Sequence, residues 1–278
     1  MAEAQSSRTS TSRDPLTLGL WCTAVGVFGF IYLPILVVIV YAFHDSPIIA
    51  WPLRLGTWRW FGALVHDRGI LEAAEASLKL ALLAVAFSLI IGVPGAFLLD
   101  RHDFPGKQAF RRLVLLPLIL PGIITGVALL TFFSFIKLSL SSGFPFVPGW
   151  PVVLGHSAAL TSVVITQVFA RLQRLDRAQE EASQDLYANE WQTFWNVTFP
   201  SIRTAVLGAG LLVFTLSLDE IAVTFFLIGR QNTLPLQIWG LLRRGITPEV
   251  NAASTVIFLL SVVAIVVWAR LMGDDRVT

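Results

Sequence analysis

The chain has 278 residues, of which 55% are hydrophobic and 14% are charged, and its mean hydropathy is +0.72. Soluble globular chains contain about 25% charged and about 45–50% apolar residues, so this composition excludes a soluble domain, a disordered chain and a disulfide scaffold. The formal net charge of +2 gives no indication of a nucleic-acid partner. The composition therefore predicts a membrane protein.

Six stretches of about 18 or more residues carry almost no charge. Several are apolar on every face, which is typical of helices in lipid and not of alternating β-barrel strands. We predict an all-α integral membrane protein with six transmembrane helices, of which the first is an uncleaved anchor. The six spans lie at about 17–43, 78–99, 113–136, 152–170, 204–228 and 250–269.

The distribution of Lys and Arg predicts the orientation of these spans. With the N-terminus inside, the inner segments hold twelve of the 20 basic residues and the outer segments hold seven. Membrane proteins keep their excess of Lys and Arg in the cytoplasm. Both termini are therefore expected there, with residues 1–16 and 271–278 as cytoplasmic tails.

The sequence contains none of the common catalytic patterns. There is no G-x-x-x-x-G-K-[ST], G-x-S-x-G, H-E-x-x-H or C-x-x-C, so we predict a non-catalytic chain without a metal or cofactor of its own. Its four histidines are scattered singly, and only His156 lies within a span. We interpret His156 as a packing residue whose hydrogen bonds are satisfied.

The inner loop at 171–203 is too long and too patterned to be a mere connector. Asp176 followed by Gln179, and Asn189 followed by Gln192, are capping-box signals that predict two short helices. The apolar and aromatic side chains of this loop are costly to leave in water. We expect the loop to dock into a partner, with an amphipathic pair lying on lipid headgroups as the alternative.

The ends of these two helices are also predicted. The first helix is expected to run to about Leu186. The second is expected to stop near Phe199, because Pro200 disfavours helical geometry in the residue before it.

Two adjacent acidic residues, Asp219 and Glu220, lie within the fifth span. On insertion scales each costs about 2.5–3.5 kcal/mol at the bilayer centre, so such a pair indicates a partner or a water-filled path. Helical spacing places Thr215 with Asp219, and Glu220 with Thr224, on neighbouring stripes. We predict that this polar strip faces the translocation path and offers negative charge to a cationic solute. The alternative is an internal salt bridge or a gate contact between subunits.

Several segments resemble a known family. Residues 181–190 read Glu-Ala-Ser-Gln-Asp-Leu-Tyr-Ala-Asn-Glu and residues 197–200 read Val-Thr-Phe-Pro, a pattern that resembles the EAA loop of ABC-importer permeases. Permeases of the spermidine/putrescine type are similar over most of residues 30–270. The segments that carry this second resemblance are Tyr-Leu-Pro-Ile at 32–35, Ser-Leu-Asp-Glu at 217–220, Leu-Pro at 234–235 and Thr-Pro-Glu-Val-Asn-Ala at 247–252.

The resemblance implies a coupling helix that sits in a cleft of a separate ATP-hydrolysing subunit. Tyr187 stands where the family has a glycine, so the left-handed turn that glycine eases is either made by a bulky residue or reshaped. Ser183 replaces the second alanine of the family pattern. The residues implied in ATPase coupling are Glu181, Ala182, Ser183, Asp185, Leu186, Tyr187 and Pro200.

The resemblance also implies a function and a set of partners. The chain is expected to be a permease subunit of an ATP-driven importer in the bacterial inner membrane, with its transmembrane domain at 72–270. Its partners would be a second related permease, two ATPase subunits that bind ATP and magnesium, and an extracytoplasmic substrate-binding protein. The implied solute is a polyamine such as putrescine or spermidine.

Two alternatives remain for the function. Permeases for ferric ion, thiamine or sulfate share the architecture of the polyamine permeases. A stand-alone secondary carrier is less favoured, because it would show inverted repeats and intramembrane charges in both halves.

Overall fold

In the computed structural model, described over residues 15–47, 51–140, 149–229, 231–243, 245 and 247–273, every regular element is a helix, as predicted. Most of the two predicted tails lies outside the described residues. The elements are α1 (Pro15–Ala42), α2 (Arg59–His66), α3 (Arg68–Arg101), α4 (Lys107–Ile119), α5 (Gly122–Phe135), α6 (Trp150–Leu172), α7 (Ala178–Asp185), α8 (Glu190–Thr193), the π-helical turn η1 (Phe194–Thr198), α9 (Phe199–Asp219), α10 (Ala222–Leu227), α11 (Leu234–Leu242) and α12 (Pro248–Gly273).

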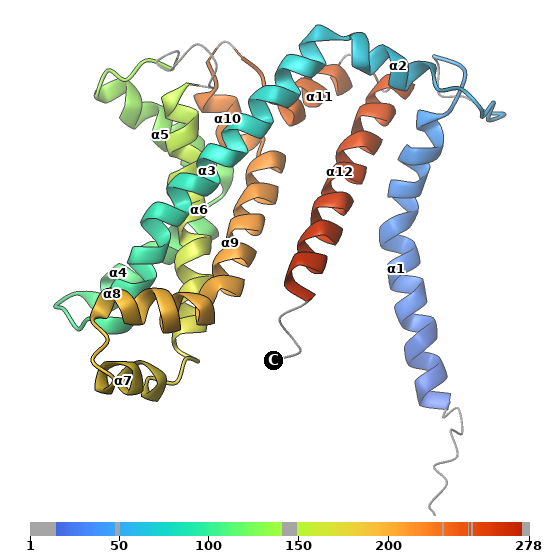
Figure 1. The fold of residues 1–278 in the computed structure, drawn as a ribbon. Coiled ribbons are helices and arrows are strands. Elements are labelled where there is room, and N and C mark those ends of the chain that lie inside the picture. The colour runs from blue at the N-terminus through green and yellow to red at the C-terminus, as the bar shows by residue number, and fades with distance from the viewer. Residues whose placement is uncertain are drawn as a thin grey trace, which may run out of the picture.

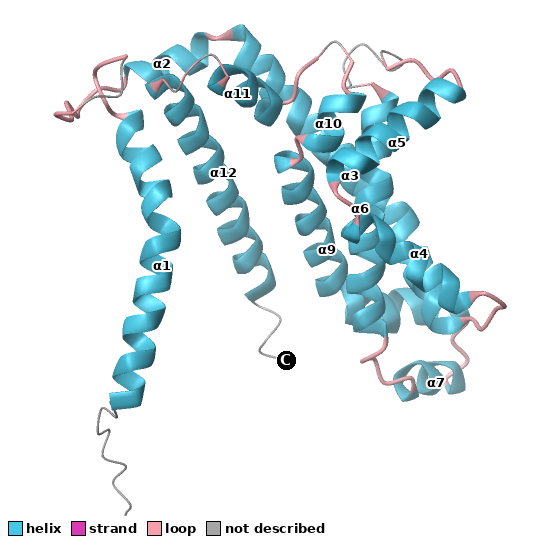
Figure 2. Cartoon of the chain, turned by 180° about the vertical axis from the view of Figure 1, so that it is seen from behind, coloured by secondary structure: helices cyan, strands magenta, loops and turns pink. Residues whose placement is uncertain are grey.

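Three long helices, α3, α6 and α9, pack together as the central bundle (Figure 1). Helices α1 and α12 stand beside it as a pair, and α2 and α11 join the two parts at one end. Helices α7 and α8 lie at the opposite end, where α1 begins and α12 ends; the view from behind shows the same arrangement (Figure 2). The side of the molecule that carries α7 therefore also carries the first residues of α1 and the last residues of α12.

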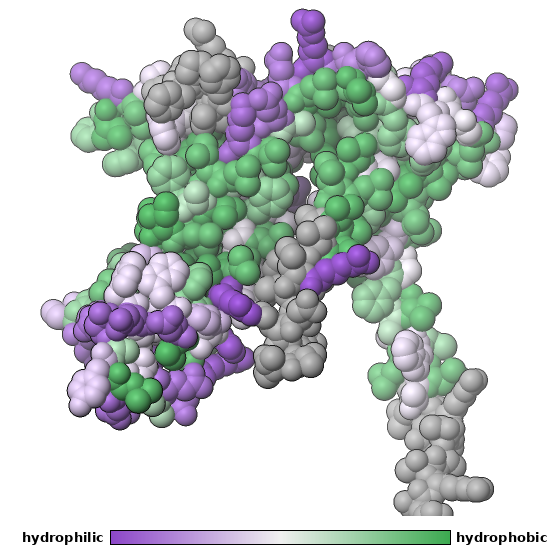
Figure 3. Space-filling view, viewed as in Figure 1, coloured by the Kyte–Doolittle hydropathy of each residue, from purple (hydrophilic) through white to green (hydrophobic). Residues whose placement is uncertain are grey.

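Length and hydropathy identify the helices that could cross a membrane. Among the described residues, four helices are long and apolar enough, and the bent pair of α4 and α5 brings the number to five. Figure 3 shows apolar surface over the middle of the bundle and hydrophilic surface toward its two ends. The four helices are Thr17–Ala42, Arg68–Arg101, Trp150–Leu172 and Glu190–Asp219.

Two of the predicted spans are broken, which corrects the prediction of continuous helices at 113–136 and 204–228. The first break separates α4 from α5, whose axes differ by 110°. Leu120 is extended there, with ψ of 135°, because the ring of Pro121 disfavours helical geometry in the residue before it. The second break follows Asp219, where Glu220 is extended with ψ of 115°.

The predicted stop at Phe199 is wrong. Phe199 is helical, and the chain continues from α8 through η1 into α9. Pro200 lacks an N–H and so leaves one backbone carbonyl in the preceding turn without its helical partner. The widened turn of η1, in which the Phe199 N–H bonds to the carbonyl of Phe194 five residues earlier, accommodates the proline within a continuous helix.

Close packing of α3 against α6 depends on a stripe of small residues. Ala84, Ser88, Gly92 and Ala96 recur every fourth position on α3 and are all buried. A Cβ atom on Gly92 would lie only 2.6 Å from the Cβ of Val164 on α6. Small residues at this spacing let two helix backbones approach closely, and the gain in packing replaces the hydrophobic driving force that lipid cannot supply.

We predict that Gly92→Ala destabilises the protein. Overpacking a tight contact costs about 1–3 kcal/mol, so the midpoint of thermal unfolding in detergent should fall. Gly240→Ala is the matched control, because a Cβ on Gly240 would have no atom within 4 Å apart from its chain neighbours and the backbone of its own helix. An unchanged midpoint for Gly92→Ala would contradict the close approach of α3 and α6.

Candidate functional site

The break after Asp219 is held by polar contacts. The Glu220 carboxylate accepts a hydrogen bond from the backbone N–H of Val223 at 2.8 Å, within the first turn of α10. The Glu220 carbonyl accepts one from the Thr224 hydroxyl at 2.8 Å. Glu220 also lies against the start of α5, since a Cβ on Gly122 would be 3.5 Å from its Oε1. The contacts of the Glu220 side chain are therefore made with residues at the break itself.

A buried histidine on α6 bridges the two helices on either side of this break. His156 Nδ1 lies 2.8 Å from the hydroxyl of Ser217 on α9, and Nε2 lies 2.8 Å from the hydroxyl of Thr224 on α10. All three side chains are buried. The interpretation of His156 as a packing residue with satisfied hydrogen bonds is confirmed, and the bridge gives it a specific structural task.

The direction of these hydrogen bonds follows from the hydroxyl of Thr224. Its single proton is donated to the Glu220 carbonyl, so it can only accept from His156. In a neutral imidazole the proton then lies on Nε2, and Nδ1 accepts from Ser217. The result is one directional chain of hydrogen bonds from Ser217 through His156 and Thr224 to the backbone of Glu220.

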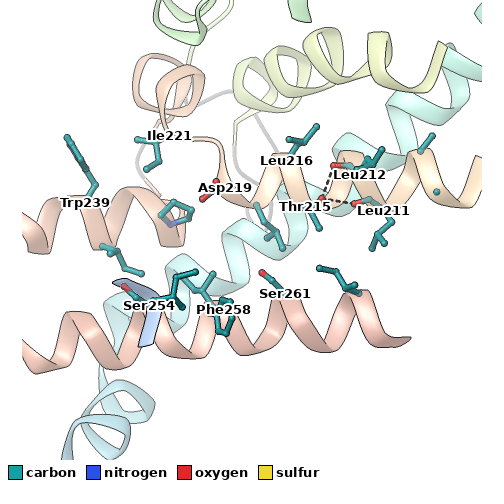
Figure 4. Close-up of a pocket in the computed structure, with 18 of the residues that line it drawn as sticks. Leu211, Leu212, Thr215, Leu216, Asp219, Ile221, Trp239, Ser254, Phe258 and Ser261 are labelled. Atoms are coloured by element: carbon teal, nitrogen blue, oxygen red, sulfur yellow. Dashed lines mark hydrogen bonds between the residues drawn. The ribbon is translucent and has the colours of Figure 1, made fainter. Parts of the chain in front are cut away.

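A cleft of about 1220 Å³ lies between α9, α11 and α12, with single residues from α1 and α6 in its wall. Its lining is mostly apolar. Among the described residues that line it, Asp219 alone carries a charge. Figure 4 shows Thr215 and Asp219 on the α9 side of the cleft, with Ser254 and Ser261 on α12 across from them.

The predicted polar strip is divided between two environments. Thr215 and Asp219 line the cleft, and the Thr215 hydroxyl donates to carbonyls of its own helix at 3.0 Å. Glu220 and Thr224 are instead engaged inside the bundle, and Thr224 is completely buried. The prediction assumed one continuous helix, and the break after Asp219 separates Glu220 and Thr224 from the cleft, although Ile221 between them still lines it.

The second predicted site, the loop between α6 and α9, has its two short helices. Asn189 and Gln192 form the predicted capping box at the start of α8. The capping box at Asp176 is wrong, because α7 begins at Ala178 and the Asp176 carboxylate accepts from the Ala178 N–H at 3.0 Å. The first helix thus starts slightly later than predicted and ends at Asp185, close to the expected position.

Tyr187 makes the left-handed turn itself, with φ of 63°. The Tyr187 N–H bonds to the Gln184 carbonyl at 2.8 Å and the Ala188 N–H bonds to the Ser183 carbonyl at 3.2 Å, which is the Schellman pattern of a helix end. A bulky residue in this conformation costs about 1 kcal/mol relative to glycine. The turn that a glycine would ease is kept, and its tip carries an aromatic ring.

The remaining coupling residues are placed as follows. Glu181, Ala182, Asp185, Leu186 and Tyr187 are exposed, and the exposed fractions of Leu186 and Tyr187 are 82% and 98%. Ser183 packs inward, with its hydroxyl 3.2 Å from that of Thr193. Pro200 lies apart from this group, in the first turn of α9.

Sequence reasoning missed two residues in these sites. Glu180, beside the exposed Glu181, points inward and bonds to Arg101 at 2.7 Å. Ser217 is the α9 partner of His156. A polar residue within an apolar span was a signal for Ser217, whereas the sequence offers none that separates Glu180 from Glu181.

Comparison with known proteins identifies the family. The chain belongs to the binding-protein-dependent transport system inner membrane components, a family whose pattern matches residues 88–274. It is similar to the putrescine transport system permease protein PotI of Escherichia coli (strain K12), with 34% identity over 253 residues that cover 90% of this chain and 89% of PotI. The spermidine/putrescine transport system permease protein PotC of Haemophilus influenzae is 33% identical over 248 residues, which cover 88% of this chain and 93% of PotC.

A solved structure shares the fold. It is the crystal structure of a bacterial alginate ABC transporter in complex with an alginate pentasaccharide-bound periplasmic protein, with a TM-score of 0.68 and 19% identity over 94% of this chain and 93% of that chain. The family match and the two permease relatives confirm the resemblance seen in the sequence. The chain is a permease subunit of an ABC importer.

We predict that His156→Leu lowers the stability of the protein. The substitution removes the bridge and leaves the buried Ser217 hydroxyl without its partner, at a cost of about 1–3 kcal/mol. The measurement is the midpoint of thermal unfolding in detergent for His156→Leu, Ser217→Ala and the double variant. The double variant should lose less than the sum of the single losses. Strictly additive losses, or a loss as large for the exposed control His102→Leu, would contradict the bridge.

Proposed function

We infer that the chain forms half of a translocation path for a cationic polyamine and couples this path to ATPase subunits on separate chains. The observation that carries the proposal is the pairing of an exposed α7 tip at one end of the bundle with an acidic side chain, Asp219, in a cleft between its helices. The names of the two bacterial relatives support the choice of a polyamine. An anionic solute such as sulfate is disfavoured beside Asp219.

The proposed topology has six spans. Helix α12 is apolar and has 26 residues, so it is counted with the four long helices and the bent pair α4–α5. The excess of Lys and Arg on this side supports a cytoplasmic location for α7 and both termini, with the helices in the bacterial inner membrane. The location of α7 at the end where α1 begins and α12 ends supports this orientation (Figure 1).

The proposed coupling surface is the exposed tip formed by Leu186 and Tyr187 with the outward face of α7. Large apolar and aromatic side chains at such a tip are stabilised when a partner covers them. The partner proposed is an ATPase subunit, which would bind ATP and magnesium and carry out hydrolysis. A second, related permease would supply the other half of the path, and an extracytoplasmic binding protein would deliver the solute. Closure of the ATPases would then switch the bundle between inward-open and outward-open states.

The first experiment measures ATP hydrolysis. The tagged chain is expressed with its native neighbours, purified into lipid nanodiscs and assayed with binding protein, with and without putrescine or spermidine. We expect an ATPase to co-purify and a polyamine to stimulate hydrolysis. Hydrolysis that is indifferent to polyamines would discard the substrate, and the absence of a co-purifying ATPase would contradict the coupling role of α7.

We predict that Asp219→Asn reduces polyamine uptake in proteoliposomes about tenfold or more. The substitution removes the charge with which the carboxylate would bind a cationic polyamine, and hydrogen bonds to a charged group contribute about 1.5–3 kcal/mol. Glu220→Gln is the matched control on the neighbouring residue. The glutamine side-chain carbonyl can still accept from the Val223 N–H, so uptake should be largely retained. Equal losses for both variants would favour a gate or structural role for the acidic pair.

A further inference from the structure

A cluster of charged side chains ties α7 to the end of α3. Glu180 Oε1 accepts a hydrogen bond from Arg101 Nη2 at 2.7 Å and a second from the Thr198 hydroxyl at 2.6 Å. Arg101 Nε lies 3.3 Å from the carboxylate of Asp100, and Arg177 Nη2 lies 3.5 Å from the same oxygen. One carboxylate oxygen of α7 thus joins two other parts of the fold.

This cluster differs from the other ion pairs of the described residues in the burial of its carboxylates. The side chains of Asp100 and Glu180 are 8% and 14% exposed, whereas Asp103, which pairs with Lys107, is 98% exposed. Exposed pairs contribute little because water and salt screen them. A carboxylate that is largely withdrawn from water and accepts two hydrogen bonds is held much more firmly. The contact of Glu180 with Arg101 is therefore a largely buried part of the fold and not a surface ion pair. We refer to this contact as the joint.

The elements that meet at Glu180 lead to the rest of the protein. Arg101 is the last residue of α3, which runs the length of the bundle (Figure 1). Thr198 is the last residue of η1, directly before α9. Helix α9 ends at Asp219, where the break and the cleft are. A displacement of α7 would reach both long helices through one oxygen atom.

We propose that Glu180 and Arg101, with Thr198, are positioning residues that transmit movement of α7 to α3 and α9 during the ATP-driven cycle. The proposal rests on the proposed function, because it needs an ATPase that moves α7. Glu180 and Glu181 then have separate tasks on one helix turn. Glu181 is exposed and available to a partner, whereas Glu180 faces the permease itself.

The proposal is tested by exchanging the two charges. The complete transporter, with its ATPases and partner permease, is prepared in proteoliposomes with Arg101→Glu, with Glu180→Arg, and with both. Three quantities are measured: ATPase co-purification, ATP hydrolysis and ATP-driven uptake of putrescine. We expect each single variant to retain its ATPase but to lose uptake about tenfold or more, as for the loss of a charged hydrogen bond. The double variant should regain most of this loss.

The exposed pair supplies the matched control. Asp103→Lys and Lys107→Glu, made singly, each disrupt an ion pair near the same end of α3, and uptake should remain within about twofold of wild type because the Asp103 carboxylate is exposed to water. If the double charge exchange stays as defective as the single variants while its ATPase is retained, Glu180 does not act through Arg101. A direct contact of Glu180 with the ATPase would give that result, and it would overturn the proposal.

Two further outcomes are distinguishable. If charge-reversed chains do not accumulate in the membrane, Arg101→Gln and Glu180→Gln form a milder cycle. In that double-mutant cycle, a loss of uptake in the double variant that is no larger than in either single variant supports the joint. Additive losses of uptake overturn it. A wild-type chain that carries no ATPase would overturn the proposed function and the joint with it. Normal ATP-driven uptake by wild type beside a failed exchange overturns the joint alone.

Discussion

A helix that stops inside an apolar bundle exposes backbone N–H and C=O groups, and each must find a partner because no water is present to supply one. The break after Asp219 meets this constraint with side chains that come from two directions. Glu220 accepts the Val223 N–H from within the break, and His156 on α6 fixes Thr224 and Ser217 on its two sides. The position of the break, and hence of the cleft beside it, depends on this hydrogen-bonded bridge.

The same constraint explains why two adjacent acids have different environments. Each carries a penalty of about 2.5–3.5 kcal/mol near the bilayer centre. For Glu220 the hydrogen bond at the start of α10 offsets part of that penalty, and the side chain is used by the fold. Asp219 makes no ion pair with any described residue and lines the cleft. Within the described part of the chain its charge has no counter-charge, which favours recognition of a cation.

The sequence predicts the helices well where local chemistry decides them. The apolar spans at 78–99 and 152–170 and the capping box at Asn189 are local signals that are found, whereas the capping box at Asp176 is an equally local signal that is not. The break after Asp219 depends on His156, which lies 61 and 68 positions from its two partners, so no local pattern could reveal it. At Pro200 the local rule failed, because a π-turn accommodates a missing N–H as effectively as a helix end. The sequence therefore indicated which residues belong to the candidate sites, but it did not indicate the directions in which their side chains point.

Helix α9 connects the two candidate sites, α7 and the cleft beside Asp219. It begins directly after Thr198, whose hydroxyl bonds to Glu180 of α7, and ends at Asp219 beside the cleft. Its middle is packed into the core with α3 and α6, where Ala209 and Val213 are buried. Closely packed interiors transmit displacement instead of absorbing it. A displacement of α7 would therefore be transmitted to the break after Asp219, where the backbone is extended and held by a few hydrogen bonds. Such a break can change its geometry without unpacking a helix.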